Sequence, residues 1–204
     1  MLEKNKIEKL FFDSIEVKES IIKKDLLYSI AEMGEVVSQS IMSGNKIMFC
    51  GNGGSAADAQ HLAAEMLVRL RPKNNREAIA AIALAQDTST ITACGNDFGY
   101  DFLFERTIKA LGREGDVLIA ITTSGNSKNI LLAMEAAKSM GIKVFAFLGC
   151  NGGKALGLAE KTFLVPSDDT GRIQESHITA GHALMEYIED KLLEEQFIHL
   201  SNQN

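Results

Sequence analysis

Two pairs of polar residues in this 204-residue sequence have the spacing of neighbours on one helix face. His61 and Glu65 are four residues apart, so their side chains lie together if the segment is helical. Gln174 and His182 are eight residues apart, a little over two helical turns, and share a face in the same way. Two imidazoles, a carboxylate and an amide oxygen form a ligand set that suits a zinc-like divalent metal.

Spacing alone leaves an equally weighted alternative, in which His61 and Glu65 form a solvated helix pair and His182 is a surface residue. Glu65 and His182 are also candidates for a base and an acid. Moving a carbonyl along a sugar requires removal of a proton beside the carbonyl and delivery of a proton to the neighbouring carbon, through an enediol(ate). His177 is about 140° from His182 around the helix, so it is the poorer partner for a shared site.

A second polar segment, Thr122-Thr-Ser-Gly-Asn-Ser127, follows an apolar run and precedes a helical stretch. It offers the hydroxyls of Thr122, Thr123, Ser124 and Ser127, a glycine, and the N-terminus of the next helix. Hydroxyls, free N–H groups and the positive end of a helix dipole together favour an anion, most often a phosphate. The alternative is an ordinary turn in which Ser127 only caps the helix.

The glycine-rich segment Gly51-x-Gly53-x-x-Ala56 also lies between an apolar run and a helical stretch. It matches the dinucleotide-binding fingerprint, which would make the protein a nicotinamide-dependent dehydrogenase. The acidic residue expected about 20 positions later, at the end of the second strand, is absent. A dehydrogenase is therefore the weaker interpretation.

Short apolar segments alternate with helical ones along most of the chain. Strands are expected at 46–50, 77–84, 116–122, 143–148 and 162–165, and helices at 7–41 (one or two, ended by Gly44), 56–69, 127–140 and 172–197. Strands that are apolar at nearly every position indicate a parallel sheet covered on both faces. We therefore predict a three-layer α/β/α sandwich with a central five-stranded parallel sheet, in which both polar loops lie at the carboxyl ends of strands.

The expected organisation is a helical region over 1–44 used in oligomer packing, a single α/β domain over 45–197, and a frayed tail over 198–204. A formal net charge of -6 argues against a nucleic-acid partner, which needs a basic face. The three cysteines are too few and too widely spaced for a disulfide framework. With no signal-peptide pattern and no apolar run long enough to span a membrane, a cytoplasmic location without membrane contact is expected.

Six segments resemble the sugar isomerase (SIS) domain family, and within it the phosphoheptose isomerase family most closely. The likeness covers about residues 20–196 and is carried by Cys50–Ser55, Asp58–His61 with Glu65 and Arg69, Cys94–Gly99, Gly112–Val117, Thr123–Ser127, and Arg172–Glu175 with His182. The resemblance implies an aldose–ketose isomerase that converts sedoheptulose 7-phosphate to D-glycero-D-manno-heptose 7-phosphate through an enediol(ate). That reaction is the first step of bacterial ADP-heptose synthesis for the lipopolysaccharide core.

The resemblance also implies roles for individual residues. Metal ligands fall on His61, Glu65, Gln174 and His182, with one zinc per subunit, and the base and acid fall on Glu65 and His182. Sugar-phosphate contacts fall on Asn52, Gly53, Gly54, Ser55, Glu65, Arg69, Asn96, Asp97, Thr122, Thr123, Ser124, Ser127 and Gln174. The family is tetrameric, with its active sites at subunit contacts.

Two positions depart from the family pattern. Thr122 stands where a serine is common, which preserves the hydroxyl. Gly171 stands where some members carry an aspartate, and Asp168 or Asp169 is the candidate to replace that sugar contact. The principal rival is a non-catalytic SIS relative that binds the replication initiator. Such relatives lack the carboxylate and the imidazole that Glu65 and His182 supply here, and arabinose 5-phosphate isomerases usually carry further regulatory domains.

Overall fold

The sheet has five parallel strands in the order β2-β1-β3-β4-β5. A computed structural model describes residues 2–85 and 87–201. The strands are β1 (Ile47–Gly51), β2 (Ala81–Ala83), β3 (Val117–Thr122), β4 (Lys143–Leu148) and β5 (Lys161–Leu164). β1, β3 and β4 are the inner strands, and their side chains are buried at nearly every position. The α/β class and the five-stranded parallel sheet are confirmed.

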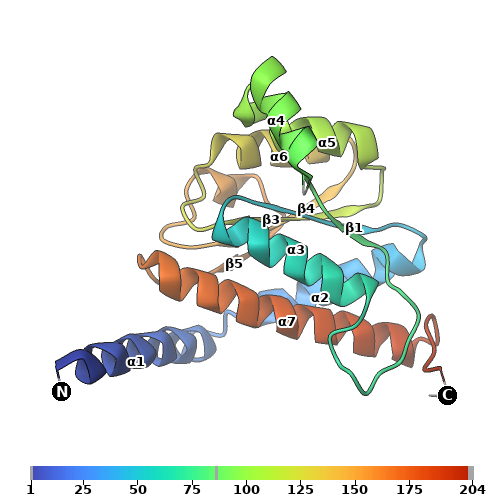
Figure 1. The fold of residues 1–204 in the computed structure, drawn as a ribbon. Coiled ribbons are helices and arrows are strands. Elements are labelled where there is room, and N and C mark those ends of the chain that lie inside the picture. Colours follow the sequence, from blue (N-terminus) through green and yellow to red (C-terminus); the bar gives the residue numbers. More distant parts are fainter. Residues whose placement is uncertain (1, 86, 202–204) are drawn as a thin grey trace.

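Helices cover both faces of this sheet. They are α1 (Leu2–Lys23), α2 (Tyr28–Met42), α3 (Gly54–Leu67), α4 (Thr88–Asp97), α5 (Leu103–Leu111), α6 (Lys128–Ser139) and α7 (Thr170–Glu194), with short 3₁₀ turns η1 (Tyr100–Phe102) and η2 (Lys154–Gly157). Figure 1 shows α4, α5 and α6 on one side of the sheet and α2, α3 and α7 on the other. The three-layer sandwich is confirmed.

Successive side chains of a strand point to opposite faces, so the strands build two cores. Ile119 of β3 packs with the core shared by α2, α3 and α7, whereas Leu118 and Ala120 pack with the core shared by α5 and α6. Full burial of a side chain of this size contributes roughly 1.5–3 kcal/mol of hydrophobic free energy. Both faces of each inner strand thus drive folding, which explains the nearly continuous apolar runs in the sequence.

The structure adds to the sequence expectation or differs from it at four segments. Residues 7–41, expected as one helix or two, form two, because the chain turns between α1 and α2, where Asp25 has a φ of 54°. The expected strand 77–84 is reduced to Ala81–Ala83, since the Ile79 N–H donates to the Met66 carbonyl rather than to a strand. Residues 198–201 are not frayed, because Ile198 is buried and the Ser201 N–H donates to the Asn75 carbonyl. Residues 202–204 lie outside the described residues.

The fourth difference is α4 and α5, which the sequence analysis did not predict. α4 is rich in threonine, a β-branched residue with modest helix propensity. Its start is fixed by Asp87, whose carboxylate accepts a hydrogen bond from the Thr90 N–H at 2.7 Å. α5 has the helical spacing of Leu103, Phe104 and Ile108, a signal that could have located it.

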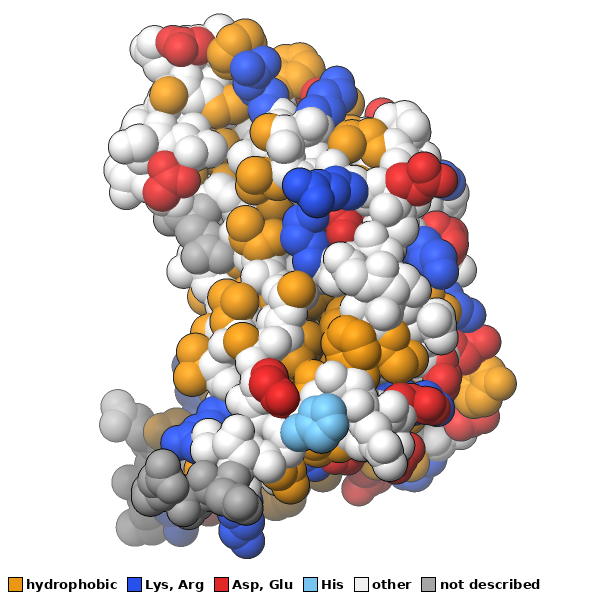
Figure 2. Space-filling model, turned by 90° about the vertical axis from the view of Figure 1, so that its right-hand side faces the viewer, with side chains coloured by type: hydrophobic (Ala, Val, Ile, Leu, Met, Phe, Trp, Pro, Cys, Tyr) orange, Lys and Arg blue, Asp and Glu red, His pale blue; other side chains and the backbone are white. Residues whose placement is uncertain are grey.

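The surface charge is mixed on the face drawn in Figure 2. There, basic and acidic side chains are interspersed and do not gather into one extended basic area. Within residues 2–85 and 87–201, none of the helices combines the length and the apolar character that crossing a bilayer requires.

His177 of α7 is a buried polar residue beside the core shared by α2, α3 and α7. Its ring lies between Phe147 and Phe163, with centroids 5.8 and 6.4 Å away, and its Nε2–H donates to the Leu148 carbonyl at 3.0 Å. Nδ1 is buried without a hydrogen-bond partner among the described residues. Burial disfavours the imidazolium and lowers the pKa of His177 to about 4, although the bond to Leu148 opposes this.

We expect this histidine to weaken the fold in acid. The unfolded chain takes up the proton near the ordinary pKa of about 6.5, whereas the folded protein does not until about pH 4. Stability should therefore fall as the pH drops from about 6.5 to 4, by up to about 3 kcal/mol from this group. Urea unfolding at several pH values and one protein concentration measures it. His177→Gln keeps a donor for Leu148 but cannot titrate, so an equally steep fall in that variant would contradict the assignment.

Candidate active site

The site is built on two helices, α3 and α7, which run in the same direction beneath the sheet (Figure 1). They approach closely because α7 has a glycine where they meet. A Cβ added to Gly181 would lie 2.7 Å from both Cδ atoms of Leu62, closer than real Cβ contacts allow. At the beginning of both helices, a Cβ added to Gly54 would lie 2.4 Å from Nε2 of Gln174. The residues next to these contacts are thereby brought face to face.

Three of the four expected metal ligands lie together at this junction. His61 Nε2 and His182 Nε2 are 2.8 Å apart, with ring centroids separated by 5.0 Å in an edge-on arrangement. Glu65 Oε1 lies 3.3 Å from His61 Nε2. One ligand atom from each residue falls within 4.8 Å of the other two. His177 is absent from this cluster, because its ring points into the core.

These donors fit a zinc ion chemically. Imidazole nitrogens and a carboxylate oxygen are its usual ligands, at about 2.0–2.2 Å from the metal. The two Nε2 atoms face each other at 2.8 Å, so a small rotation of either ring would leave room between them for a cation. Gln174 lies about two turns before His182 and contacts the first turn of α3, on the same side as the cluster. His61, Glu65 and His182 therefore form a candidate metal centre, and Gln174 stays a predicted fourth ligand.

The two polar loops meet at the carboxyl ends of β1 and β3, where α3 begins. They are joined by a reciprocal amide pair: Asn52 Nδ2 donates to Asn129 Oδ1, and Asn129 Nδ2 donates to Asn52 Oδ1, each at 2.9 Å. The Tyr100 hydroxyl also donates to Asn52 Oδ1, at 2.8 Å. Sequence reasoning assigned Asn52 to sugar contact and missed Asn129 and Tyr100. A buried asparagine needs partners, but no local pattern indicates which residues supply them.

The expected phosphate loop pairs some of its own polar groups, since the Asn126 N–H donates to Ser124 Oγ at 3.2 Å. Ser127 is the N-cap residue of α6, yet its side chain makes no cap hydrogen bond, so the simple capping interpretation does not account for its hydroxyl. Thr122 Oγ1 accepts from the Gly125 N–H, which holds the turn closed. The backbone of Gly152 packs against this turn: a Cβ on Gly125 would lie 2.0 Å from the Gly152 carbonyl oxygen. Only a glycine permits this contact, which fixes the loop at the N-terminus of α6.

The other first-loop residues begin α3. Gly53 is the N-cap residue, with a φ of 57°, and Gly54 and Ser55 form the first turn beside Asn52. Thr123 and Ser124 continue the loop after β3, with Ser124 exposed.

Several other expected contacts lie apart from the cluster in this chain. Asn96 and Asp97 are exposed at the end of α4, in the helix layer on the other side of the sheet, where Asn96 Nδ2 donates to Asp97 Oδ1. Arg69 is exposed just after α3. Asp169 caps α7 by accepting from the Gly171 and Arg172 N–H groups, so its carboxylate already has partners.

Comparisons with known proteins identify the family of this chain. The family model described as "SIS domain" matches residues 10–149. The chain is 49% identical to the phosphoheptose isomerase of Leptospira biflexa, over 88% of this chain and 92% of that protein. It is 47% identical to that of Aquifex aeolicus, over 95% and 99%.

A solved phosphoheptose isomerase from Neisseria gonorrhoeae superposes with a TM-score of 0.85 at 41% identity, covering 93% of this chain and all of that one. These similarities give no support to the initiator-binding alternative. The chain belongs to the SIS domain family and, within it, to the phosphoheptose isomerases.

Proposed function

We propose that this protein converts sedoheptulose 7-phosphate to D-glycero-D-manno-heptose 7-phosphate. The observation that carries the proposal is the meeting of Glu65, His61 and His182 at one point, on a helix, α3, that begins at one of two loops at the carboxyl ends of neighbouring strands. A carboxylate and an imidazole serve the proton transfers, and the loops serve the phosphate and hydroxyls of the sugar. The product would enter bacterial ADP-heptose synthesis for the lipopolysaccharide core.

Glu65 acts as the base in this scheme. It removes a proton from C1 of the ketose, and the electron pair forms the C1–C2 double bond of an enediol(ate). His182 gives a proton to O2 as negative charge develops there, and then takes the proton of the O1 hydroxyl, which leaves a carbonyl at C1. Return of the first proton to C2 completes the aldose with no net change in protons.

A metal centre supports the same chemistry. His61, Glu65, His182 and Gln174 would hold zinc, which when bound polarises the carbonyl and stabilises charge on the sugar oxygens. Glu65 has two carboxylate oxygens, and Oε1 is the one that faces His61. We assign Oε1 to the metal and the second oxygen to proton abstraction, which lets one residue fill both roles.

The loops provide the remaining contacts in this proposal. Thr122, Thr123, Ser124 and Ser127 bind the phosphate, and the first turn of α3, Gly53 to Ser55, faces the sugar. Asn52 orients the loop through Asn129, because both of its amide atoms are already paired. Arg69 adds positive charge on the approach to the cluster, which suits an anionic substrate.

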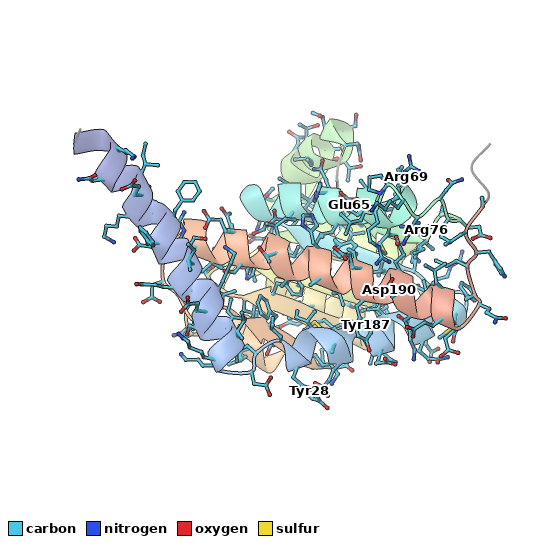
Figure 3. All side chains as sticks on the ribbon, turned by 90° about the horizontal axis from the view of Figure 1, so that it is seen from below. Tyr28, Glu65, Arg69, Arg76, Tyr187 and Asp190 are labelled. Atoms are coloured by element: carbon cyan, nitrogen blue, oxygen red, sulfur yellow. The ribbon has the colours of Figure 1, made fainter. Side chains whose placement is uncertain are left out.

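We further propose that the active protein is a homotetramer in the cytoplasm. α1 projects from the body of the chain (Figures 1 and 3) and exposes a row of large apolar side chains: Ile7, Leu10, Phe11, Phe12 and Ile15. Such an area favours a protein partner. Asn96 and Asp97 would reach a sugar bound to a neighbouring subunit. The three cysteines are unpaired, as expected in a reducing compartment.

The first test is turnover. Heptulose, pentulose and hexulose phosphates are assayed side by side, and the heptulose phosphate should give the highest kcat/KM. Glu65→Gln and His182→Asn should each lose about 10²–10⁴-fold in kcat, because one proton transfer loses its catalyst. Glu105→Gln and His199→Asn change the same residue types outside the cluster, on α5 and after α7, and should retain activity. Full turnover by Glu65→Gln would eliminate Glu65 as the base.

The second test concerns the metal. Protein purified without chelator should contain about one zinc per subunit, and His61→Ala should contain far less because it lacks a ligand. Elemental analysis measures the content, and the visible absorption of a cobalt-substituted sample reports nitrogen and oxygen ligation. His177→Gln alters a histidine outside the cluster and should keep its zinc. Full activity after exhaustive chelation would remove the metal from the mechanism.

The third test concerns assembly. Phe11→Asp places a charge in the apolar row of α1, so its mass in light scattering should fall below that of a tetramer. Lys6→Glu changes the charge on the opposite side of the same helix and should leave the tetramer intact. A monomeric wild-type protein with full activity would contradict the proposed assembly.

A further inference from the structure

A buried ion pair lies next to the candidate metal centre, between the end of α3 and α7. Arg76 and Glu189 have side chains that are 0% and 1% exposed, and Arg76 Nε lies 2.8 Å from Glu189 Oε2. Arg76 belongs to the segment that leads from α3 to β2, and Glu189 belongs to α7. The pair therefore ties the end of α3 to α7, the two helices on which the ligands lie.

The remaining donors of Arg76 point at the last turn of α3. Nη2 donates to the backbone carbonyl of Glu65 at 2.8 Å, and Nη1 donates to that of Met66 at 3.0 Å. The last carbonyls of a helix have no partners within the helix and carry its negative dipole charge. Arg76 satisfies two of them and brings a positive charge to that end. One of the two carbonyls belongs to the proposed base itself.

Glu189 connects this arrangement to the second histidine. It follows His182 by seven residues, which is close to two turns, so both lie on the side of α7 that faces α3. Its carboxylate also accepts from Arg71 Nε at 2.8 Å and from Asn74 Nδ2. Burial acts to raise the pKa of Glu189, but bonds from Arg76, Asn74 and Arg71 hold it below its usual range. Figure 3 shows Glu65, Arg69 and Arg76 at this end of α3, with Asp190 on α7.

We propose that Arg76 and Glu189 are positioning residues that fix the last turn of α3 against α7 and so hold Glu65 at its working distance from His182. Neither residue touches the substrate. The inference rests on the proposed metal centre and isomerase activity, and it adds two residues that act through Glu65.

Three variants distinguish a positioning role of the Arg76–Glu189 pair from a contribution to overall stability alone. Arg76→Met leaves Glu189 buried without its strongest partner, so it should destabilise the protein. Arg76→Met/Glu189→Met removes both charges, and such replacements commonly restore stability. Asp116→Asn is the matched control. Asp116 is 1% exposed and lies 2.6 Å from Lys46 Nζ, but it precedes β3, and its carboxylate bonds to Lys46 and to the Arg113 N–H rather than to α3 or α7.

We expect zinc affinity, measured by competition with a chromophoric chelator, to fall about 10- to 100-fold in Arg76→Met, as for other supporting residues of metal sites. The double variant should regain thermal stability without regaining affinity, because the Glu65 carbonyl still lacks the Arg76 donor and the Met66 carbonyl keeps only the Ile79 N–H. In metal-free protein, hydrogen exchange of the amides of residues 66–68 should accelerate in both variants. kcat should fall with little change in KM, since the phosphate loop is untouched. Asp116→Asn should lose only stability, with zinc affinity and amide exchange unchanged.

Two results would overturn the inference. One is recovery of zinc affinity and slow exchange together with stability in the double variant. The other is an equal loss of affinity in Asp116→Asn, which would reduce the effect to global destabilisation. A wild-type protein that binds no zinc and isomerises no sugar phosphate would refute the proposed function. The exchange measurement would still decide whether Arg76 fixes the end of α3.

Discussion

The candidate site depends on the close approach of α3 and α7. Gly181 permits it, because any larger residue would place a Cβ against the two methyl groups of Leu62. Each contact residue is the sequence neighbour of a histidine: Leu62 follows His61, and Gly181 precedes His182. A shift of one helix would change the spacing of the imidazoles directly. Residues placed on packed helices hold their geometry better than residues placed on loops, which is what proton transfer and metal ligation require.

In the proposed function the loops meet a different requirement, which is to bind an anion in a protein with a net charge of -6. They use neutral groups for this purpose: hydroxyls, backbone N–H groups and the N-terminus of α6. Position is supplied by the parallel sheet, because the carboxyl ends of β1 and β3 are adjacent. The Asn52–Asn129 pair then joins the loops through two hydrogen bonds without adding charge. A net negative charge is therefore compatible with binding one phosphate.

Sequence reasoning reached the features that depend on local periodicity. Helical spacing placed His61 with Glu65 and Gln174 with His182, and apolar runs located the inner strands. It could not tell that Gly181 allows the two helices to meet, or that Arg76 reaches the carbonyl of Glu65, since both contacts join distant segments. The prediction of the extent of β2 was wrong for the same reason. The Ile79 N–H bonds to the end of α3, and packing between distant segments decides between that bond and pairing with a strand. The threonine-rich α4 was not predicted because its helix propensity is weak. Its start depends on one hydrogen bond, from the Thr90 N–H to the Asp87 side chain.

The Arg76–Glu189 pair illustrates why a buried charge can serve geometry better than stability. Desolvation of two ions cancels much of their attraction, so apolar side chains of similar volume often stabilise a core equally well. Apolar side chains cannot, however, donate hydrogen bonds to the ends of a helix. The guanidinium is planar and presents five donors in fixed directions, which here reach one carboxylate and the carbonyls of Glu65, Met66 and Glu77. A lysine at this position would keep the charge but lose this directional set, so the requirement is for arginine and not merely for a cation.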